Sequence, residues 1–375
     1  MTADPRTAPV LVPLPLPTDL DAPDAWLLHG MVDAVNDVLL DTWGTRDEAR
    51  VAGEQLAALR DQEYVTRLRF VALDAPPEAG PPDPARVLGR AVLDLPRQDN
   101  THTGSAGVEV RPAHRGRGIG AALHDLVIAT ARAHGRSTLT ASSDHAAEPD
   151  AGPGTLAPST GTGRVRADDR GVAFLAHRGW TLEQVVRRSV LDLPVDAPVL
   201  AGHAAAAARA AGPDYRVVRW EARCPDELVD QFAHLQTRMS TDAPKGGLDL
   251  REDVWDAARV RAAEQTYVDR GMPYRVAAAL HQPTGDLVAY TSLVSRPDSD
   301  EFVFQDDTLV LREHRGHRLG MLVKTANLAR LAEVQPGARR IGTWNAEENA
   351  HMLAINVALG FRPAGGSGEW QLRLG

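Results

Sequence analysis

The stretch Val108-Glu109-Val110-Arg111-Pro112-Ala113-His114-Arg115-Gly116-Arg117-Gly118-Ile119-Gly120 has the pattern of a β-strand that passes through a glycine-rich turn into a helix. Three glycines alternate through the turn, so backbone N–H groups can approach an anion with no Cβ in between. A helix N-terminus already favours negative charge, and three arginines with no acid from Arg111 to Gly120 add to this preference. The pattern predicts a phosphate-binding turn; the alternative is a glycine-rich helix start with solvated arginines.

The residues that follow the turn distinguish between the known types of phosphate-binding turn. A nucleotide-binding P-loop needs Lys and then Ser or Thr after its last glycine, but Gly120 is followed by Ala121 and Ala122. The dinucleotide fingerprint prefers a glycine at position 121 and lies after the first strand of its domain, whereas this strand comes late. The sequence therefore disfavours both of these nucleotide sites.

The composition limits the class of protein. A chain of 375 residues, 43% of them hydrophobic, exceeds one compact core, so two domains are expected. The net charge is −9 and both halves are acidic, which argues against nucleic-acid binding. The single cysteine, Cys224, excludes an internal disulfide and a cysteine zinc site, as is typical of a cytoplasmic protein. Six prolines between Met1 and Asp24 exclude an apolar signal or membrane helix there.

Hydrophobic periodicity predicts a mixed order of strands and helices in the first 200 residues. A short edge strand is followed by two helices, three strands, the glycine-rich turn with its helix, and then a strand, a helix and one long or paired strand. The expected strands are 10–16, 64–73, 86–95, 108–110, 137–141 and 180–193, and the expected helices are 24–43, 51–59, 119–134 and 171–177. This order predicts an α/β fold of the α+β mixed-sheet type.

The second half repeats the first. His314-Arg315-Gly316-His317-Arg318-Leu319-Gly320 lies 200 positions after His114-Arg115-Gly116-Arg117-Gly118-Ile119-Gly120, and both follow an apolar strand and open a helix. Each half also closes on a glycine–aromatic pair, Gly179-Trp180 and Gly360-Phe361. The chain is therefore expected to be a tandem duplication with its boundary near residue 200, joined by an Ala-rich helix at 199–211 that bridges the two halves.

The pattern Arg-x-x-Gly-x-Gly at Arg115, Gly118 and Gly120 resembles the pyrophosphate loop of the GNAT superfamily of acyl-CoA-dependent N-acyltransferases. With the repeat, most of the chain resembles the tandem GNAT proteins of actinobacteria. The resemblance implies two GNAT domains, 1–200 and 201–375, with acetyl-CoA as a substrate. It also implies that the strand before each turn and the strand after its helix splay apart to admit the pantetheine arm.

The resemblance also assigns the residues that bind acetyl-CoA. In the first half, pyrophosphate contacts fall on the turn and pantetheine contacts on the preceding strand: Val108, Val110, Arg115, Gly116, Arg117, Gly118, Ile119 and Gly120. The matching second-half positions are Val310, Arg315, Gly316, His317, Arg318, Leu319 and Gly320, together with Asn349 from the closing helix.

Two departures from the family pattern concern the same sites. Arg318 stands where the first turn has Gly118, which brings a side chain into the space nearest the pyrophosphate. The general-acid tyrosine that the family often carries falls on Asn356 in the second half and on Leu175 in the first, and the helix asparagine of the first half falls on Asp168. Neither half therefore has the usual acid.

A catalytic base is expected on the strand before each turn, because amide formation requires an amine that has lost its proton. The candidates are Asp307 and Asp306 in the second half and Glu109 in the first. Partial burial beside a second carboxylate would raise one pKa of the aspartate pair. Strand alternation predicts that only one of the two aspartates faces the acceptor. The alternative is that these acids pair with arginines or lie at a strand end.

These observations predict an N-acetyltransferase that acts on a primary amine of a small molecule by direct attack, since no activated nucleophile is visible. A protein or peptide acetyltransferase and a non-catalytic acyl-CoA-binding scaffold remain open. No metal site is expected, because the histidines lack ligand spacing. The expected protein is cytoplasmic, with no nucleic-acid or membrane partner, and the sequence identifies neither its acceptor nor its oligomeric state.

Overall fold

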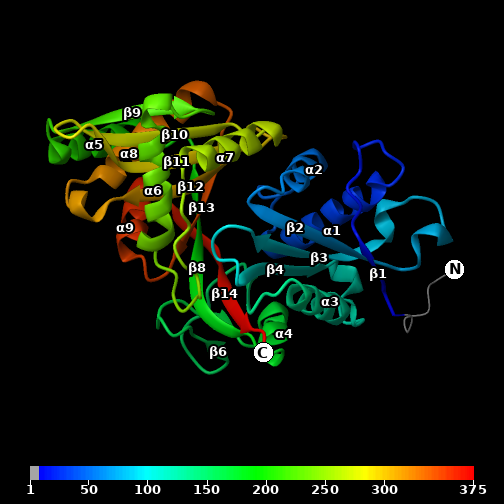
Figure 1. Cartoon of the computed structure of the whole chain (residues 1–375). Helices are drawn as coiled ribbons and strands as arrows, with labels where there is room; N and C mark the ends of the chain where they lie inside the picture. The colour runs from blue at the N-terminus through cyan, green and yellow to red at the C-terminus, as the bar shows by residue number, and fades with distance from the viewer. Residues whose placement is uncertain (1–7) are drawn as a thin grey trace.

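A computed structural model describes residues 8–375, so the first seven residues of the expected first half, Pro5 among them, lie outside the described residues. The chain folds around one mixed sheet of twelve strands, in the order β1-β2-β3-β4-β5-β14-β8-β13-β12-β11-β10-β9 (Figure 1). A separate pair of short strands, β6 and β7, lies outside this sheet. The mixed sheet that the sequence predicts is therefore present.

The first half contains the expected elements in the expected order. They are β1 (Val10–Pro13), α1 (Ala25–Trp43), α2 (Ala52–Arg60), β2 (Val65–Leu73), β3 (Val87–Pro96), β4 (Thr103–Val110), α3 (Ile119–Ala133), β5 (Thr138–His145), β6 (Thr155–Leu156), β7 (Val165–Arg166), α4 (Arg170–His177) and β8 (Thr181–Asp192). The segment 180–193, which the sequence left as one strand or two, forms the single strand β8.

The second half repeats this order after a linker helix. Its elements are α5 (Ala197–Ala211), β9 (Tyr215–Glu221), α6 (Val229–Asp242), α7 (Ala257–Asp269), β10 (Tyr274–His281), β11 (Asp286–Ser295), β12 (Phe302–Val310), α8 (Leu319–Val334), β13 (Arg340–Ala346), α9 (Ala350–Leu359) and β14 (Arg362–Arg373). Short 3₁₀ turns at Pro112–His114 and Arg312–His314 precede the two glycine-rich turns.

The last strand of each half is built into the sheet between two strands of the other half. Strand β14, at the end of the chain, pairs with β5 on one side and with β8 on the other. Strand β8, in turn, pairs with β13 of the second half. Figure 1 shows β14 (red) beside β8 (green) at the centre of the molecule. Each half therefore lends a strand to the sheet of the other.

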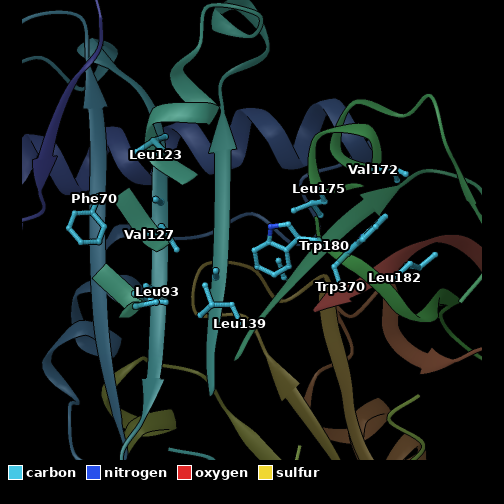
Figure 2. Packing of buried hydrophobic residues seen from close by; sticks show 14 of the residues in the cluster. Phe70, Leu93, Leu123, Val127, Leu139, Val172, Leu175, Trp180, Leu182 and Trp370 are labelled. Carbon is cyan, nitrogen blue, oxygen red and sulfur yellow. The ribbon is translucent and has the colours of Figure 1, made fainter. Parts of the chain in front are cut away.

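The exchanged strand contributes to the first-half core. Trp370 of β14 is 1% exposed and packs in the same cluster as Leu139 and Trp180 (Figure 2). Its indole Nε1 donates to Ser143 Oγ at 2.8 Å, which satisfies the polar end of a buried tryptophan. The first-half core is thus completed by a residue close to the C-terminus.

Helices cover both faces of the sheet. Leu123 and Val127 of α3 pack with Phe70 of β2, whereas α1 packs with the adjacent Val71. Successive residues of a strand point to opposite faces, so α1 and α3 cover opposite sides. In the second half, α6 packs with Tyr290 of β11 and α8 packs with the neighbouring Ala289, which repeats the arrangement.

The linker helix differs from its prediction. The sequence predicts that it bridges the halves, but α5 packs mainly against α8 and α9 of the second half, and the cluster around its buried Ala207 includes only the end of β8, at Leu191, from the first-half strands. The exchanged strands join the halves instead. Ion pairs add to the junction: Asp47, in the α1–α2 connection, receives two hydrogen bonds of 2.7 Å from Arg340 of β13.

Candidate active site

The two glycine-rich turns have nearly the same backbone. Gly116 and Gly118 have φ values of +77° and +81°, and the matching Gly316 and Arg318 have +90° and +56°. An L-residue in this left-handed region costs about 1–2 kcal/mol, so Arg318 holds a conformation that Gly118 adopts freely. No atom lies within 4 Å of the Cβ positions of Gly116, Gly118 or Gly316, so the space in front of both turns is open. Both turns can therefore receive a pyrophosphate on backbone N–H groups.

The first arginine of each turn, Arg115 or Arg315, ties the turn to the strand that precedes it. Arg115 Nε donates to the carbonyl of Val110 at 3.1 Å, and Arg315 Nε donates to that of Val310 at 3.3 Å. Each guanidinium also meets an acid at the end of a helix, Asp41 at 2.7 Å and Asp242 at 3.6 Å. These side chains hold the turn against its strand, which leaves the backbone groups to bind a ligand.

The strands on either side of each helix diverge. Strands β4 and β5 pair in parallel only from Thr103–Ser105, and β12 and β13 only from Phe302–Phe304. Beyond these pairs the strands separate, so an opening begins before Val108, Val110 and Val310 and leads to each turn. The expected residues of both turns thus border two openings, one in each half.

Glu109, the first-half candidate base, is neutralised by an arginine. Its two carboxylate oxygens accept from Arg90 Nε and Nη2 at 3.0 and 3.1 Å, across directly paired positions of β3 and β4. A two-point ion pair with a guanidinium compensates the charge of the carboxylate and fixes its orientation. The arrangement matches the arginine-paired alternative that the sequence left open.

Asp306 and Asp307 occupy a β-bulge. Strand β11 pairs with β12 through Thr291–Thr308 and again through Leu293–Gln305, so both aspartates lie opposite the single residue Ser292. A bulge interrupts the alternation of side chains along a strand. The prediction that the aspartates point to opposite faces is therefore wrong.

Both carboxylates face the α6–α7 side of the sheet, where two tyrosines meet them. Tyr290 donates to Asp307 Oδ2 at 3.1 Å, and Tyr267 of α7 donates to Asp306 Oδ2 at 3.4 Å. Tyr267 is stacked on Tyr274, with ring centroids 4.7 Å apart. Helix α7 therefore fixes the carboxylate of Asp306, and strand β11 fixes that of Asp307.

The surroundings of the aspartate pair raise the pKa of both carboxylates. Desolvation by the surrounding protein and the charge of Asp307 raise the pKa of Asp306 to about 7. Desolvation also raises the pKa of Asp307, while the hydrogen bond from Tyr290 opposes this shift. The two groups titrate together, so near neutral pH the pair holds a proton that it can exchange.

The closing helices have no tyrosine at the position where the family often carries its general acid. Asn349 caps α9, with its side-chain oxygen accepting from the backbone N–H of Met352 at 3.2 Å. Asn356 is buried and donates to Asn345 Oδ1 at 2.7 Å. In the first half, Leu175 packs in the core. The structure therefore agrees with the sequence that the tyrosine position is filled by residues that cannot donate a catalytic proton.

Sequence reasoning missed a second acidic group, on β5 and β14. Asp144 lies opposite Ser367, and Glu369, two pairs further along, accepts from Ser142 Oγ at 2.9 Å. Burial raises the pKa of Asp144 to about 7, and the charge of Glu369 adds to the shift. The group forms only because β14 returns from the end of the chain, so no local pattern could have revealed it.

The remaining candidates have structural roles. Cys224 is buried, and burial raises the pKa of its thiol to about 12, so it is not a nucleophile. His314 lies 2.9 Å from the hydroxyl of Tyr215 and packs against His281 beside the second turn. Within residues 8–375, no cluster of three or more His, Cys, Asp or Glu side chains could hold a metal ion. No helix in the same range is long and apolar enough to cross a membrane.

Comparisons with known proteins agree with this geometry. The acetyltransferase (GNAT) family matches residues 41–149. A tandem GNAT protein from the clavulanic acid biosynthesis pathway superposes with a TM-score of 0.74 at 27% identity, over 98% of this chain and 99% of that one. No curated protein matches the sequence.

More distant structures share the fold alone. A GCN5-related N-acetyltransferase from Sphaerobacter thermophilus gives a TM-score of 0.55 at 12% identity, over 93% of both chains. A glucosamine N-acetyltransferase region of a fungal β-N-acetylglucosaminidase gives 0.58 at 15% identity, over 97% of this chain and 38% of that one. Together with the paired turns and splayed strands, the family match and the tandem GNAT structure show that the chain has an acyltransferase fold of the GNAT type, present in two copies in tandem.

Proposed function

We propose that the protein transfers the acetyl group of acetyl-CoA to the primary amine of a small molecule, by direct attack within a ternary complex. The observation that carries the proposal is the aspartate pair in the bulge of β12, held by Tyr267 and Tyr290 beside the opening to the second turn. The pair supplies a carboxylate whose pKa lies near neutrality, as a general base requires.

The residues fit acetyl-CoA at the places that the resemblance assigns. Open space lies in front of Gly116, Gly118 and Gly316, and the backbone N–H groups at the start of α3 and α8 would hold the pyrophosphate. When bound, acetyl-CoA supplies an activated thioester. The chain then holds the acceptor amine beside Asp307 or Asp306. As the C–N bond forms and the C–S bond breaks, one of these carboxylates takes the proton that the nitrogen gives up, and the CoA thiolate takes up a proton from water.

We propose that the chemistry takes place in the second half, 201–375, and that the first half, 1–200, serves mainly to bind acetyl-CoA. The support is the contrast between the candidate bases. Glu109 is tied to Arg90, whereas no arginine or lysine of residues 8–375 forms an ion pair with Asp306 or Asp307. The intact glycines of the first turn favour acetyl-CoA binding there.

The experiment is a panel of primary amines, incubated with acetyl-CoA and read by the release of free thiol. Acetylation of at least one small amine, confirmed by the mass of the product, supports the proposal. Acetylation of peptides alone would identify a protein acetyltransferase. Saturable acetyl-CoA binding with no thiol release from any amine would leave a non-catalytic scaffold and refute the proposal.

A further inference from the structure

Arg50 lies in the α1–α2 connection and is fixed there by its backbone. Its N–H donates to Asn36 Oδ1 at 2.7 Å, and its carbonyl accepts from Asn36 Nδ2 at 2.9 Å. The side chain is only partly exposed. The backbone of Arg50 is thus fixed against α1 by Asn36, and its side chain is partly covered by neighbouring residues.

The acids that surround Arg50 are already paired with other arginines. Glu54 pairs with Arg270 of α7, and Glu48 pairs with Arg188 at 2.6 Å. Arg90, a third charged neighbour of Arg50, is itself paired with Glu109.

Arg50 is left without a counter-charge. Within residues 8–375, no carboxylate forms an ion pair with it and its guanidinium donates no hydrogen bond to a protein group, although the charges of Glu54 and Glu48 act on it. Surrounding protein desolvates the guanidinium, which lowers its pKa, and the charges of Arg90 and Arg270 act in the same direction. A guanidinium nevertheless stays protonated in proteins. The fold therefore presents a partly exposed cation with no counter-charge among the described residues, a counter-charge that an anionic ligand would supply.

The neighbours of Arg50 include residues of the acceptor region. Arg270 acts electrostatically on Arg50 and also on Tyr267, the tyrosine that donates to Asp306. Helices α2 and α7, from opposite halves, meet at this point, where Thr266 Oγ1 donates to Asp61 at 2.9 Å. An anion on Arg50 would therefore lie between the halves, on the side of the sheet to which the aspartate pair points.

We propose that the acyl acceptor carries a carboxylate and that Arg50 binds it, so that the substrate is an amino acid or another amine-bearing carboxylic acid. The proposal rests on the proposed function and adds the class of its substrate. The planar fork of a guanidinium matches two carboxylate oxygens. The nearby acids Glu48 and Glu54 disfavour a doubly charged phosphate and leave a singly charged carboxylate as the better ligand.

The test compares matched amines that differ only at the acid group, such as β-alanine and 3-aminopropanamide, or an α-amino acid and its amide. The wild-type protein is expected to prefer the acid by about tenfold or more in kcat/KM, which corresponds to one charge-assisted contact. Arg50→Gln is expected to abolish this preference by raising KM for the acid, with KM for the amide unchanged. Arg50→Lys, which keeps the charge but loses the fork, should fall in between.

The control is Arg132→Gln, on the exposed side of α3, which should leave the preference intact. Equal use of acid and amide by the wild type, or a preference that survives Arg50→Gln, would overturn the proposal even if acetyl transfer is efficient.

A binding measurement separates this inference from the proposed function. Carboxylates such as β-alanine should raise the melting temperature of the wild type more than their amides do, and Arg50→Gln should remove the difference. This result would support the anion site in a protein that transfers no acetyl group. An equal rise in melting temperature with the carboxylate in the wild type and in Arg50→Gln would refute the anion site. A phosphate ester that stabilises better than a carboxylate would show that the anion class is wrong.

Discussion

The candidate carboxylates of the two halves lie in different electrostatic surroundings, although the two halves have the same fold. Glu109 sits in a regular strand pair with Arg90 directly opposite, so its charge is compensated. Asp306 and Asp307 sit in a bulge among tyrosines that donate hydrogen bonds but carry no charge. The difference comes from one inserted strand position and from the residue opposite it, which is Ser292 in the second half and Arg90 in the first.

The raised pKa of Asp306 also predicts a change in stability with pH. The folded state holds a proton on this group that the unfolded chain, with a pKa of 3.8, has released, so the group lowers stability progressively as pH rises from about 4 to about 7. Asp306→Asn removes the penalty and should raise the melting temperature at pH 8 more than at pH 5. The control is Asp150→Asn on an exposed loop. A smaller gain at pH 8 than at pH 5 would contradict the pKa direction.

The two turns make a prediction about acetyl-CoA affinity. Because the first turn has glycine at the position where the second has Arg318, acetyl-CoA should bind the first half at least as tightly as the second. Gly118→Arg introduces a side chain at a positive φ and beside the pyrophosphate, so it should weaken binding to the first site, while Arg318→Gly serves as the reciprocal control. Calorimetric titration gives both affinities. Unchanged affinity in Gly118→Arg would show that the first turn is not the binding site.

At the scale of elements, the sequence predicted the local patterns and missed the distant pairings. Periodicity and the repeat located nearly every helix and strand, because amphipathic spacing is a property of the segment itself. The insertion of β14 between β5 and β8 depends on residues more than 200 positions apart, such as Ser142 and Glu369, and leaves no local signal. The bulge in β12 escaped for a related reason, since it is a property of the pairing with β11.

For the candidate site, too, the sequence predicted the local features and missed the contacts between distant residues. The glycine spacing located both turns, and the strand before each turn contained the candidate acids. The contacts of those acids could not be read from the sequence, because Arg90 and Tyr267 come from other elements. Arg50 and Asp144 were missed entirely, since the features that mark them are an unpaired charge and a raised pKa, which exist only in the folded protein.

The exchanged strand β14 predicts a long-range effect of a single substitution. Trp370→Ala should destabilise the protein by about 3–5 kcal/mol, as for other large residues deleted from a core. Because Trp370 packs with first-half residues, hydrogen exchange should accelerate in α3 and α4, far away in sequence. Arg373→Ala, on the same strand but exposed, is the control. Faster exchange confined to the second half would contradict the packing described here.

At the scale of the whole molecule, the exchange makes each half depend on the other. A fragment 1–200 would lack β14 between β5 and β8, and a fragment 201–375 would lack β8 between β13 and β14. Each would expose unpaired strand edges, which promote association. Expressed together, the fragments should therefore form a stoichiometric complex on size-exclusion chromatography. Two soluble fragments that remain monomeric when mixed would show that the halves are independent domains.

The central claim is that the aspartate pair of the second half accepts the proton of the acceptor amine. The direct measurement is the pH profile of kcat/KM for acetyl transfer, read by free thiol, in the wild type, Asp307→Asn and Glu109→Gln. The wild-type profile should rise with pH through an apparent pKa near 7, because the pair must lose its proton to act as a base. Asp307→Asn should lower the rate at neutral pH by roughly 10²-fold with little change in acetyl-CoA binding, and Glu109→Gln should keep most of the activity. Full activity in Asp307→Asn, with the loss in Glu109→Gln, would contradict the account and move the chemistry to the first half.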